Sequence, residues 1–437
     1  MFTTLKNAFK IKEIRKKLFF TFMMLVVIRL GSQLPVPGIN RNFFADWFAQ
    51  QTGDAFNFFN AFTGGSFLNM SVLALNITPY ITSSIIMQLM TIAIPKLEEM
   101  QRDGADGRKK IASITRYVTV VLALVEASAM AIGFGRQGLL QTYNVMNIIT
   151  VIAALTAGSA FLMWVGERIT ERGVGNGISI VLTINILSRM PQDITQLFEQ
   201  FVIGRSIAKG VVAAIIIIAI IILMVVLVII LNDGVRKIPV QYAKKVQGRK
   251  MIGGQTTNIP LKINTSGVIP VIFASSLLQL PVLVCSFFNI GGTGVWGEIL
   301  KGLNSNYWCN PSQPIYSIGL VVYIVLVILF AYFYTSITFN PLEIAENMKK
   351  QGGFIPGIRP GRPTSDYLSR VLTYIIFIGA VGLTIVCVVP YFFNGIFGAS
   401  VSFSGTSLII IVSVVLETVK QIESQMLVRN YKGFLND

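Results

Sequence analysis

The sequence predicts an all-α polytopic membrane protein with ten transmembrane helices. Three observations predict it: hydrophobic residues make up 53% of the 437 residues, charged residues make up only 13%, and the apolar residues gather into long runs. A soluble domain carries about 25% charged residues. A run of about 20 apolar residues is long enough to cross the hydrocarbon core as a helix. The runs do not alternate with period two, which excludes a transmembrane barrel.

The predicted spans follow one another along the whole chain. The first comes after a basic N-terminal segment, and no small-residue cleavage site ends it, so it is interpreted as a membrane helix rather than a signal peptide. Segment 1–17 itself fits either a short interfacial helix or a disordered tail. The fifth span is too short to cross alone, and we expect it to extend on one side. The spans are 18–34, 72–94, 114–134, 148–168, 178–190, 207–231, 267–289, 316–339, 368–392 and 407–427.

The residue types present exclude several kinds of chemistry. There is no histidine, and the three cysteines, Cys285, Cys309 and Cys387, are scattered. An odd number of cysteines at such spacing is no disulfide framework. A zinc site or a His-based catalytic centre has no candidate ligands or base. We therefore expect no metal, no cofactor and no enzymatic activity.

The basic residues predict the orientation in the membrane. Most of the 36 Lys and Arg residues lie in the two terminal segments and in alternate loops, above all 95–116, 232–266 and 340–367. An excess of Lys and Arg marks the cytoplasmic side. Both termini and these loops are therefore expected in the cytoplasm, and 35–71 and 290–315 outside. Ten spans satisfy that arrangement because ten is an even number.

Loop 232–266 is more basic than orientation alone requires. It holds seven basic residues and a single acidic residue, Asp233. The positive-inside rule explains most of the net charge of +16. A docking surface for an anionic partner, such as ribosomal RNA or an acidic protein, explains the excess in this loop. Both interpretations stay open on the sequence.

Ten short motifs occur in order along the chain, at consistent distances from the spans. They are LPVPGI at 34–39, FTGG at 62–65, TPYI at 78–81, GRKKI at 107–111, TERGVGNGIS at 170–179, QGR at 247–249, IPLK at 259–262, GVIPVIFASS at 267–276, TFNP at 338–341 and GFIPGIRPG at 353–361. Through them the chain resembles the SecY family, which contains the central subunits of protein translocons.

The resemblance implies a clamshell of two pseudo-symmetric halves around a pore. The halves would be 1–190, with helices 1–5, and 191–437, with helices 6–10. It also implies a passive protein-conducting channel in the bacterial cytoplasmic membrane, which translocates unfolded preproteins and releases transmembrane segments sideways into lipid. The partners it implies are the SecE and SecG membrane subunits, the SecA motor ATPase, the ribosome, signal peptides, nascent chains and membrane lipids.

The same resemblance assigns a pore ring and a plug. The ring falls on five aliphatic residues, whose side chains would close around an extended peptide and leave a constriction too dry for ions. These are Ile77, Ile81, Leu182, Ile272 and Ile410. The plug lies near 60–69, where glycines allow a tight fold around an apolar body; its alternative is an ordinary outer loop. The plug residues are Phe62, Gly64, Gly65, Phe67 and Leu68.

The lateral gate is expected between spans 72–94 and 267–289. Gln88 and Asn264 are polar residues near its cytoplasmic end, and a hydrogen bond between them would hold the gate shut. Docking of SecA and the ribosome is expected at the basic loops. The candidate docking residues are Arg249, Lys250, Arg359 and Arg362.

Two charged residues lie inside predicted spans. Arg29 is 11 residues into its span and Glu126 is 12 into its own, counted from the cytoplasmic ends, so their depths match. A buried charge needs a partner, and we predict an ion pair that braces helices 1 and 3. A protonated Glu126, or one that faces a wet cavity, is the alternative.

Two other function classes compete with a channel. A secondary transporter of small solutes also uses broken helices, but it places ionisable residues at the midplane, and Glu126 is the single candidate. An intramembrane enzyme needs a nucleophile with a base, and no His or mid-span Asp is available. No P-loop occurs either, so the energy for transport must come from a motor, from synthesis or from the proton-motive force.

Overall fold

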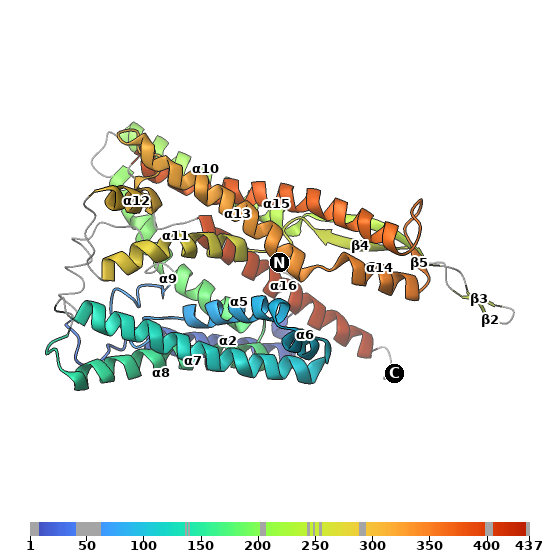
Figure 1. The fold of residues 1–437 in the computed structure, drawn as a ribbon, viewed down its shortest axis with the longest axis horizontal. Coiled ribbons are helices and arrows are strands. Elements are labelled where there is room, and N and C mark those ends of the chain that lie inside the picture. The colour runs from blue at the N-terminus through green and yellow to red at the C-terminus, as the bar shows by residue number, and fades with distance from the viewer. Residues whose placement is uncertain are drawn as a thin grey trace.

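The computed structural model describes residues 8–40, 63–135, 138, 140–201, 207–242, 245–247, 250–252, 256–287, 294–397 and 405–433. Ten long helices correspond to the ten predicted spans (Figure 1). They are α2 (Lys12–Gly31), α5 (Thr78–Ala93), α7 (Ala105–Gly135), α8 (Val145–Arg172), α9 (Gly177–Phe201), α10 (Ile207–Asp233), α11 (Ile269–Phe287), α13 (Ile318–Thr338), α15 (Arg362–Phe397) and α16 (Gly405–Gly433).

Shorter elements connect these helices. α6 (Pro95–Arg102) follows α5 after a bend of 107°, because Ile94 is extended and Pro95 lacks the donor that would continue the helix. The others are α12 (Val295–Leu303), η1 (Ser305–Tyr307), η2 (Pro314–Ser317) and α14 (Pro341–Lys350), with strands β1 (Val235–Tyr242), β2 (Lys245–Gln247), β3 (Lys250–Ile252), β4 (Thr256–Lys262) and β5 (Gly353–Phe354).

Length and apolar composition alone identify only part of this set. Among the described residues, five helices pass such a test, and α5 with α6 makes a sixth if the bent pair is one span. α2 carries basic residues through its first turns and Arg29 near its end. α9 combines the kink residue Pro191 with Arg189 and Asp193. α9 lies between α8 and α16, so neighbouring helices can satisfy its polar groups. α2 instead leaves Phe19, Phe22 and Leu30 exposed.

The helices form two packed halves of a clamshell. In the first half, α7 packs against α5 and α8, and α2 packs against α8. In the second, α13 packs against α11 and α15, and α10 packs against α15 and α16. α9 contacts α8 on one side and α16 on the other, so it joins the halves. Figure 1 shows α2 and α5–α8 below and α10, α11, α13 and α15 above. The predicted ten-helix clamshell is confirmed, and the fifth span extends at its C-terminal side to Phe201.

A small sheet projects from one end of the helices. β1 follows α10 directly and lies between β4 and β5, antiparallel to both; β2 and β3 form a separate hairpin beyond it. The inner face of β1 buries Ile238 and Val240 in a core with Met348 of α14 and Leu368 of α15. We call this part, the described residues within 234–262 and 341–362, the sheet end.

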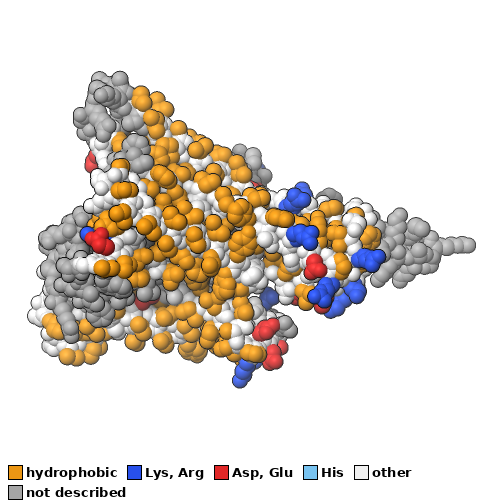
Figure 2. Space-filling model, turned by 45° about the horizontal axis from the view of Figure 1, so that its top comes forward, with side chains coloured by type: hydrophobic (Ala, Val, Ile, Leu, Met, Phe, Trp, Pro, Cys, Tyr) orange, Lys and Arg blue, Asp and Glu red, His pale blue; other side chains and the backbone are white. Residues whose placement is uncertain are grey.

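Apolar and basic side chains occupy different parts of the surface. Figure 2 shows apolar side chains spread over the broad helical part and basic side chains gathered toward the narrow sheet end. On the helical part, α10 leaves Ile215, Ile218 and Ile222 more than half exposed, as expected of a lipid-facing helix. Near the start of the described chain, Ala8 and Ile14 pack with Ile422 of α16.

Candidate functional site

All five predicted ring residues lie in one hydrophobic cluster where the two halves meet. Ile77 is the N-cap of α5 and Ile81 lies in its first turn, while Leu182 belongs to α9, Ile272 to α11 and Ile410 to α16. Ile77, Leu182 and Ile410 are almost fully buried, whereas Ile81 and Ile272 are partly exposed. Four helices therefore contribute to a single aliphatic layer, which we call the ring cluster.

A tight glycine turn positions α9 in this layer. Asn176 caps the helix, since its Oδ1 accepts from the backbone N–H of Ile178 at 3.2 Å. A Cβ on Gly177 would lie 2.0 Å from the carbonyl oxygen of Gly166, so only glycine allows α8 and α9 to approach this closely. The turn also contacts α2, because Thr21 Oγ1 accepts from the N–H of Val174 at 3.2 Å. The motif at 170–179 thus fixes where Leu182 stands.

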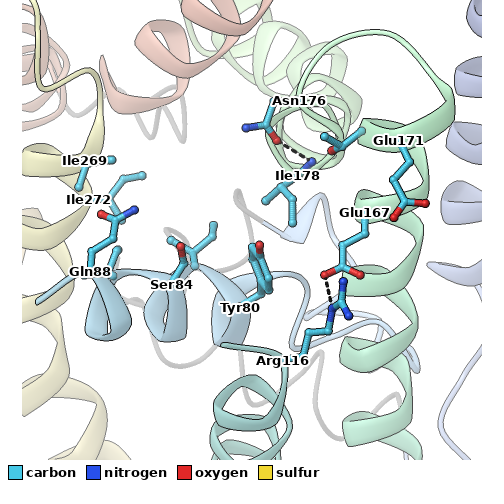
Figure 3. A pocket seen from close by; sticks show the side chains of 13 residues that line it. Tyr80, Ser84, Gln88, Arg116, Glu167, Glu171, Asn176, Ile178, Ile269 and Ile272 are labelled. Carbon is cyan, nitrogen blue, oxygen red and sulfur yellow. Dashed lines mark hydrogen bonds and ion pairs between the residues drawn. The ribbon is translucent and has the colours of Figure 1, made fainter. Parts of the chain in front are cut away.

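A cavity of about 440 Å³ opens on the sheet-end side of the ring cluster. Ile81 and Ile272 line it, together with Ser84 and Gln88 of α5 (Figure 3). Arg116 of α7 and Glu167 of α8 form an ion pair at its edge, 2.7 Å from Nε to Oε1. The further lining residues are Tyr80, Ile85, Thr170, Glu171, Asn176, Ile178 and Ile269. An open cavity with both polar and apolar walls therefore ends on the aliphatic ring cluster.

The segment predicted as a plug lies beside α9 beyond Leu182, since Gly64 approaches Asn185 and Ser188, whereas the cavity lies at the other end of α9, beside Asn176 and Ile178. Its described residues form consecutive turns, with Gly64 and Gly65 at positive φ. Phe67 is 6% exposed and packs in the core of the first half, while Leu68 is half-buried. Phe62 lies outside the described residues. The segment is thus a compact body against the first half, whichever role it has.

The expected hydrogen bond between Gln88 and Asn264 is not formed. Asn264 Nδ2 donates to Asn232 Oδ1 at 3.1 Å, and Asn232 in turn donates to Ser413 Oγ at 2.7 Å. The reason is the sheet register: β1 leaves α10 and pairs with β4, which brings Asn264 back beside the end of α10. Gln88 is exposed in the cavity. α5 and α11 do face the same cavity, as expected of a gate.

The expected ion pair between Arg29 and Glu126 is also absent. Arg29 Nη1 donates instead to Asn185 Oδ1 at 3.3 Å. The depths of the two charges match, but α2 packs on α8 and α9, whereas α7 packs on α5 and α8. Matching depth is necessary for a pair and is not sufficient, because the two helices must also be neighbours.

The structure describes three of the four candidate docking residues. Arg359 and Arg362 are exposed at the sheet end, and the carbonyl of Arg359 accepts from Thr364 Oγ1 at 2.8 Å, which fixes the turn. Lys250 begins β3, at the tip of the sheet end. Arg249 lies outside the described residues.

Sequence reasoning missed the polar residues that border the ring cluster. Asn76 directly precedes Ile77, and Asn185 follows Leu182 by one helical turn; both are buried and bonded to each other. The signal was present, because an asparagine beside a ring position is a polar group at membrane depth that needs a partner. The pair of Arg116 and Glu167 was missed because only basic residues were counted for orientation, and Arg116 was counted there without a partner.

Comparison with known proteins places the chain in a family. Residues 71–419 match the family model described as SecY. A protein translocase subunit SecY of Halalkalibacterium halodurans is 42% identical over 442 residues, covering all of both chains. A solved structure described as that of a protein conducting channel has a TM-score of 0.62 at 19% identity, covering 97% of each chain. Sec61 in a canine ribosome–channel complex has a TM-score of 0.60 at 18% identity, again over 97% of each chain.

Proposed function

The chain belongs to the SecY family, and from that premise we propose which of its residues form the pore, the seal and the docking surface. Its function is that of a passive protein-conducting channel, and it is not an enzyme. The observation that carries the residue assignment is the ring cluster: five aliphatic side chains from both halves meet in one layer. That layer separates the open cavity from the compact segment at 63–76.

In this proposal the ring cluster is the constriction. Bulky aliphatic side chains exclude water and therefore ions, but they can part around an extended chain without losing specific bonds. The segment that includes Gly64, Gly65, Phe67 and Leu68 is the plug, and Phe62 completes it. The cavity between α5 and α11 is the entrance, with Gln88 on its wall. Asn264 acts within the second half, by holding the base of α11 to α10.

We further propose that the two halves move about α9. The sequence boundary between 190 and 191 falls inside this helix, at Pro191. A proline removes one helix hydrogen bond and permits a kink. Separation of the halves there would open the ring cluster and the side facing lipid together.

The sheet end is proposed as the cytoplasmic docking surface. Arg236, Lys237, Lys262, Arg359 and Arg362 are exposed there. Lys250, the first residue of β3, and Arg249, which lies outside the described residues, are proposed to bind with them. An exposed basic surface attracts an anionic partner such as ribosomal RNA, or an acidic face of SecA. SecE and SecG would contact the apolar band that also meets membrane lipids, while signal peptides and nascent chains enter through the cavity.

Topology in the bacterial cytoplasmic membrane has a direct test. With both termini and the sheet end in the cytoplasm, an alkaline phosphatase fusion at Asn304 should be active and one at Lys245 should be silent. The opposite pattern would overturn the proposed orientation.

Transport itself is tested in proteoliposomes that contain this chain with SecE and SecG. Addition of SecA, ATP and an unfolded preprotein should protect the preprotein from external protease. Uptake of small solutes without preprotein protection would favour a secondary transporter and would refute the proposed channel residues.

A further inference from the structure

We propose that Arg29, Asn185 and Asn76 form a polar clasp that holds the plug against the ring cluster and so sets how readily the channel opens. The inference rests on the proposed plug assignment. It adds to that assignment three positioning residues, none of which belongs to the ring or to the plug segment 60–69.

The clasp is a continuous chain of hydrogen bonds through the first half. Arg29 Nη1 of α2 donates to Asn185 Oδ1 of α9 at 3.3 Å, and Asn185 Nδ2 donates to Asn76 Oδ1 at 2.9 Å. The carbonyl of Asn76 accepts from Ser159 Oγ of α8 at 3.1 Å. Asn76 is 1% exposed and Asn185 is 3% exposed, so the bonds of Asn76 are made away from water, where a lost partner is costly. Arg29 is half-buried and reaches the buried Asn185 from α2.

The plug backbone lies directly on this chain of bonds. A Cβ on Gly64 would stand 2.6 Å from the carbonyl oxygen of Asn185 and 3.0 Å from Arg29 Nη1. Gly64 has φ of +62°, so both its conformation and its surroundings require glycine. A guanidinium carries five N–H donors. Arg29 can therefore hold Asn185 and still attract the carbonyl groups of the segment beside it.

The position of the clasp ties it to the ring cluster. Asn76 is the residue before Ile77, and Asn185 lies one turn beyond Leu182 on the side away from the cavity. Any displacement of Ile77 or Leu182 that widens the ring also shifts an asparagine of the clasp. All clasp residues belong to α2, α9 and the segment before α5, whereas Ile272 and Ile410 come from α11 and α16. Separation of the halves alone therefore leaves the plug held, and release needs the clasp to break.

The experiment measures plug displacement through a thiol at Ser66, which is 3% exposed. Ser66→Cys is placed in a chain whose three native cysteines are replaced by alanine. A membrane-impermeant maleimide is then added from outside to resting channels and to channels jammed by a preprotein with a folded C-terminal domain. Labelling should be slow at rest and fast when jammed. Equal, slow labelling in both states would overturn the plug assignment, and the clasp with it.

Breaking the clasp should release the plug at rest. Arg29→Met should raise Ser66→Cys labelling and ion leak about tenfold, which is the shift expected from one lost charge-assisted hydrogen bond. Ser83→Ala is the matched control, since it removes a buried hydrogen bond of 2.5 Å to Thr119 elsewhere in the first half. If jammed channels label fast but Arg29→Met labels no faster than Ser83→Ala at rest, the clasp is refuted and the plug is retained.

A second variant should act in the opposite direction. Asn185→Asp gives Arg29 a carboxylate partner and a stronger hydrogen bond, and the Asn76 amide can turn to donate to it. Labelling and leak should fall below wild type, and export should require a more hydrophobic signal sequence. Damage to the fold cannot tighten a seal, so slower labelling with this variant supports the clasp. Faster labelling or higher leak, at a melting temperature equal to that of the wild type, would overturn it.

Discussion

The ring cluster and the sheet end use their side chains in opposite ways. In the ring cluster, Ile77 and Ile410 are 0% and 3% exposed and make no polar contact through their side chains. At the sheet end, Arg359 and Lys262 are exposed and charged over a small apolar core. Closure therefore depends on the removal of water, which is local and insensitive to salt. Docking depends on long-range charge, which water and ions weaken.

Ionic strength should separate the two regions most clearly. Ribosome binding to the sheet end should weaken about a hundredfold or more between 50 and 200 mM salt, since several basic contacts release counterions together. The ion leak of the resting channel, divided by bulk conductivity, should not change. Binding is measured by co-sedimentation with detergent-solubilised channel. Binding that is independent of salt would mean that the basic surface does not carry docking.

A polar substitution in the ring cluster should have the next largest effect. Ile410→Asn removes one buried aliphatic side chain, worth about 1.5–3 kcal/mol, and places an amide where water was excluded. Resting ion leak in proteoliposomes should rise about tenfold to a hundredfold, and weakly hydrophobic signal sequences should pass. Ile218→Asn, on the lipid-facing side of α10 at 58% exposed, should reduce insertion without either effect. Equal leak in the two variants would remove Ile410 from the ring.

A charge reversal at the sheet end should affect docking without affecting the fold. Arg359→Glu places a carboxylate toward a partner surface that is expected to be acidic. SecA-driven export should fall about tenfold while the melting temperature stays within about 1 °C. Arg370→Glu is the control, because it makes the same change in net charge at an exposed position on α15. Similar losses in both variants would indicate a general effect of charge and not a docking site.

The same contrast explains how much the sequence could predict. A helix that crosses lipid needs a long apolar segment, so the spans from 207–231 to 368–392 could be predicted directly from composition. The ring residues were found through motif resemblance, because an aliphatic residue in a pore and one facing lipid look alike in sequence. The sequence did not show which helices are neighbours. The depths of Arg29 and Glu126 match, yet their helices α2 and α7 do not pack together. Asn264 was assigned to the wrong partner because a β register outside the membrane decides where it lies.

The smallest effect is expected where a charged pair lies outside both regions. On α12, Glu298 Oε1 lies 3.2 Å from Lys301 Nζ, and the hydroxyl of Tyr316 donates to the other carboxylate oxygen. The hydrogen bond from Tyr316, followed by that from Lys301, lowers the pKa of Glu298. A lowered folded-state pKa means that the contribution to stability is present above the unfolded pKa of about 4.3 and is lost as pH falls through the folded value.

Because this cluster is exposed, its loss should be local and slight. Glu298→Gln at pH 7 should speed hydrogen exchange in 295–317 by less than about fivefold, with leak and export unchanged. Wild type should show the same acceleration below about pH 4, after correction for the intrinsic pH dependence of exchange, and the variant should show no further acceleration there. A faster exchange that also reached the helices α13 and α15 would mean that an exposed pair supports the second half. Exposed charges would then stabilise the packed helices as well as bind partners.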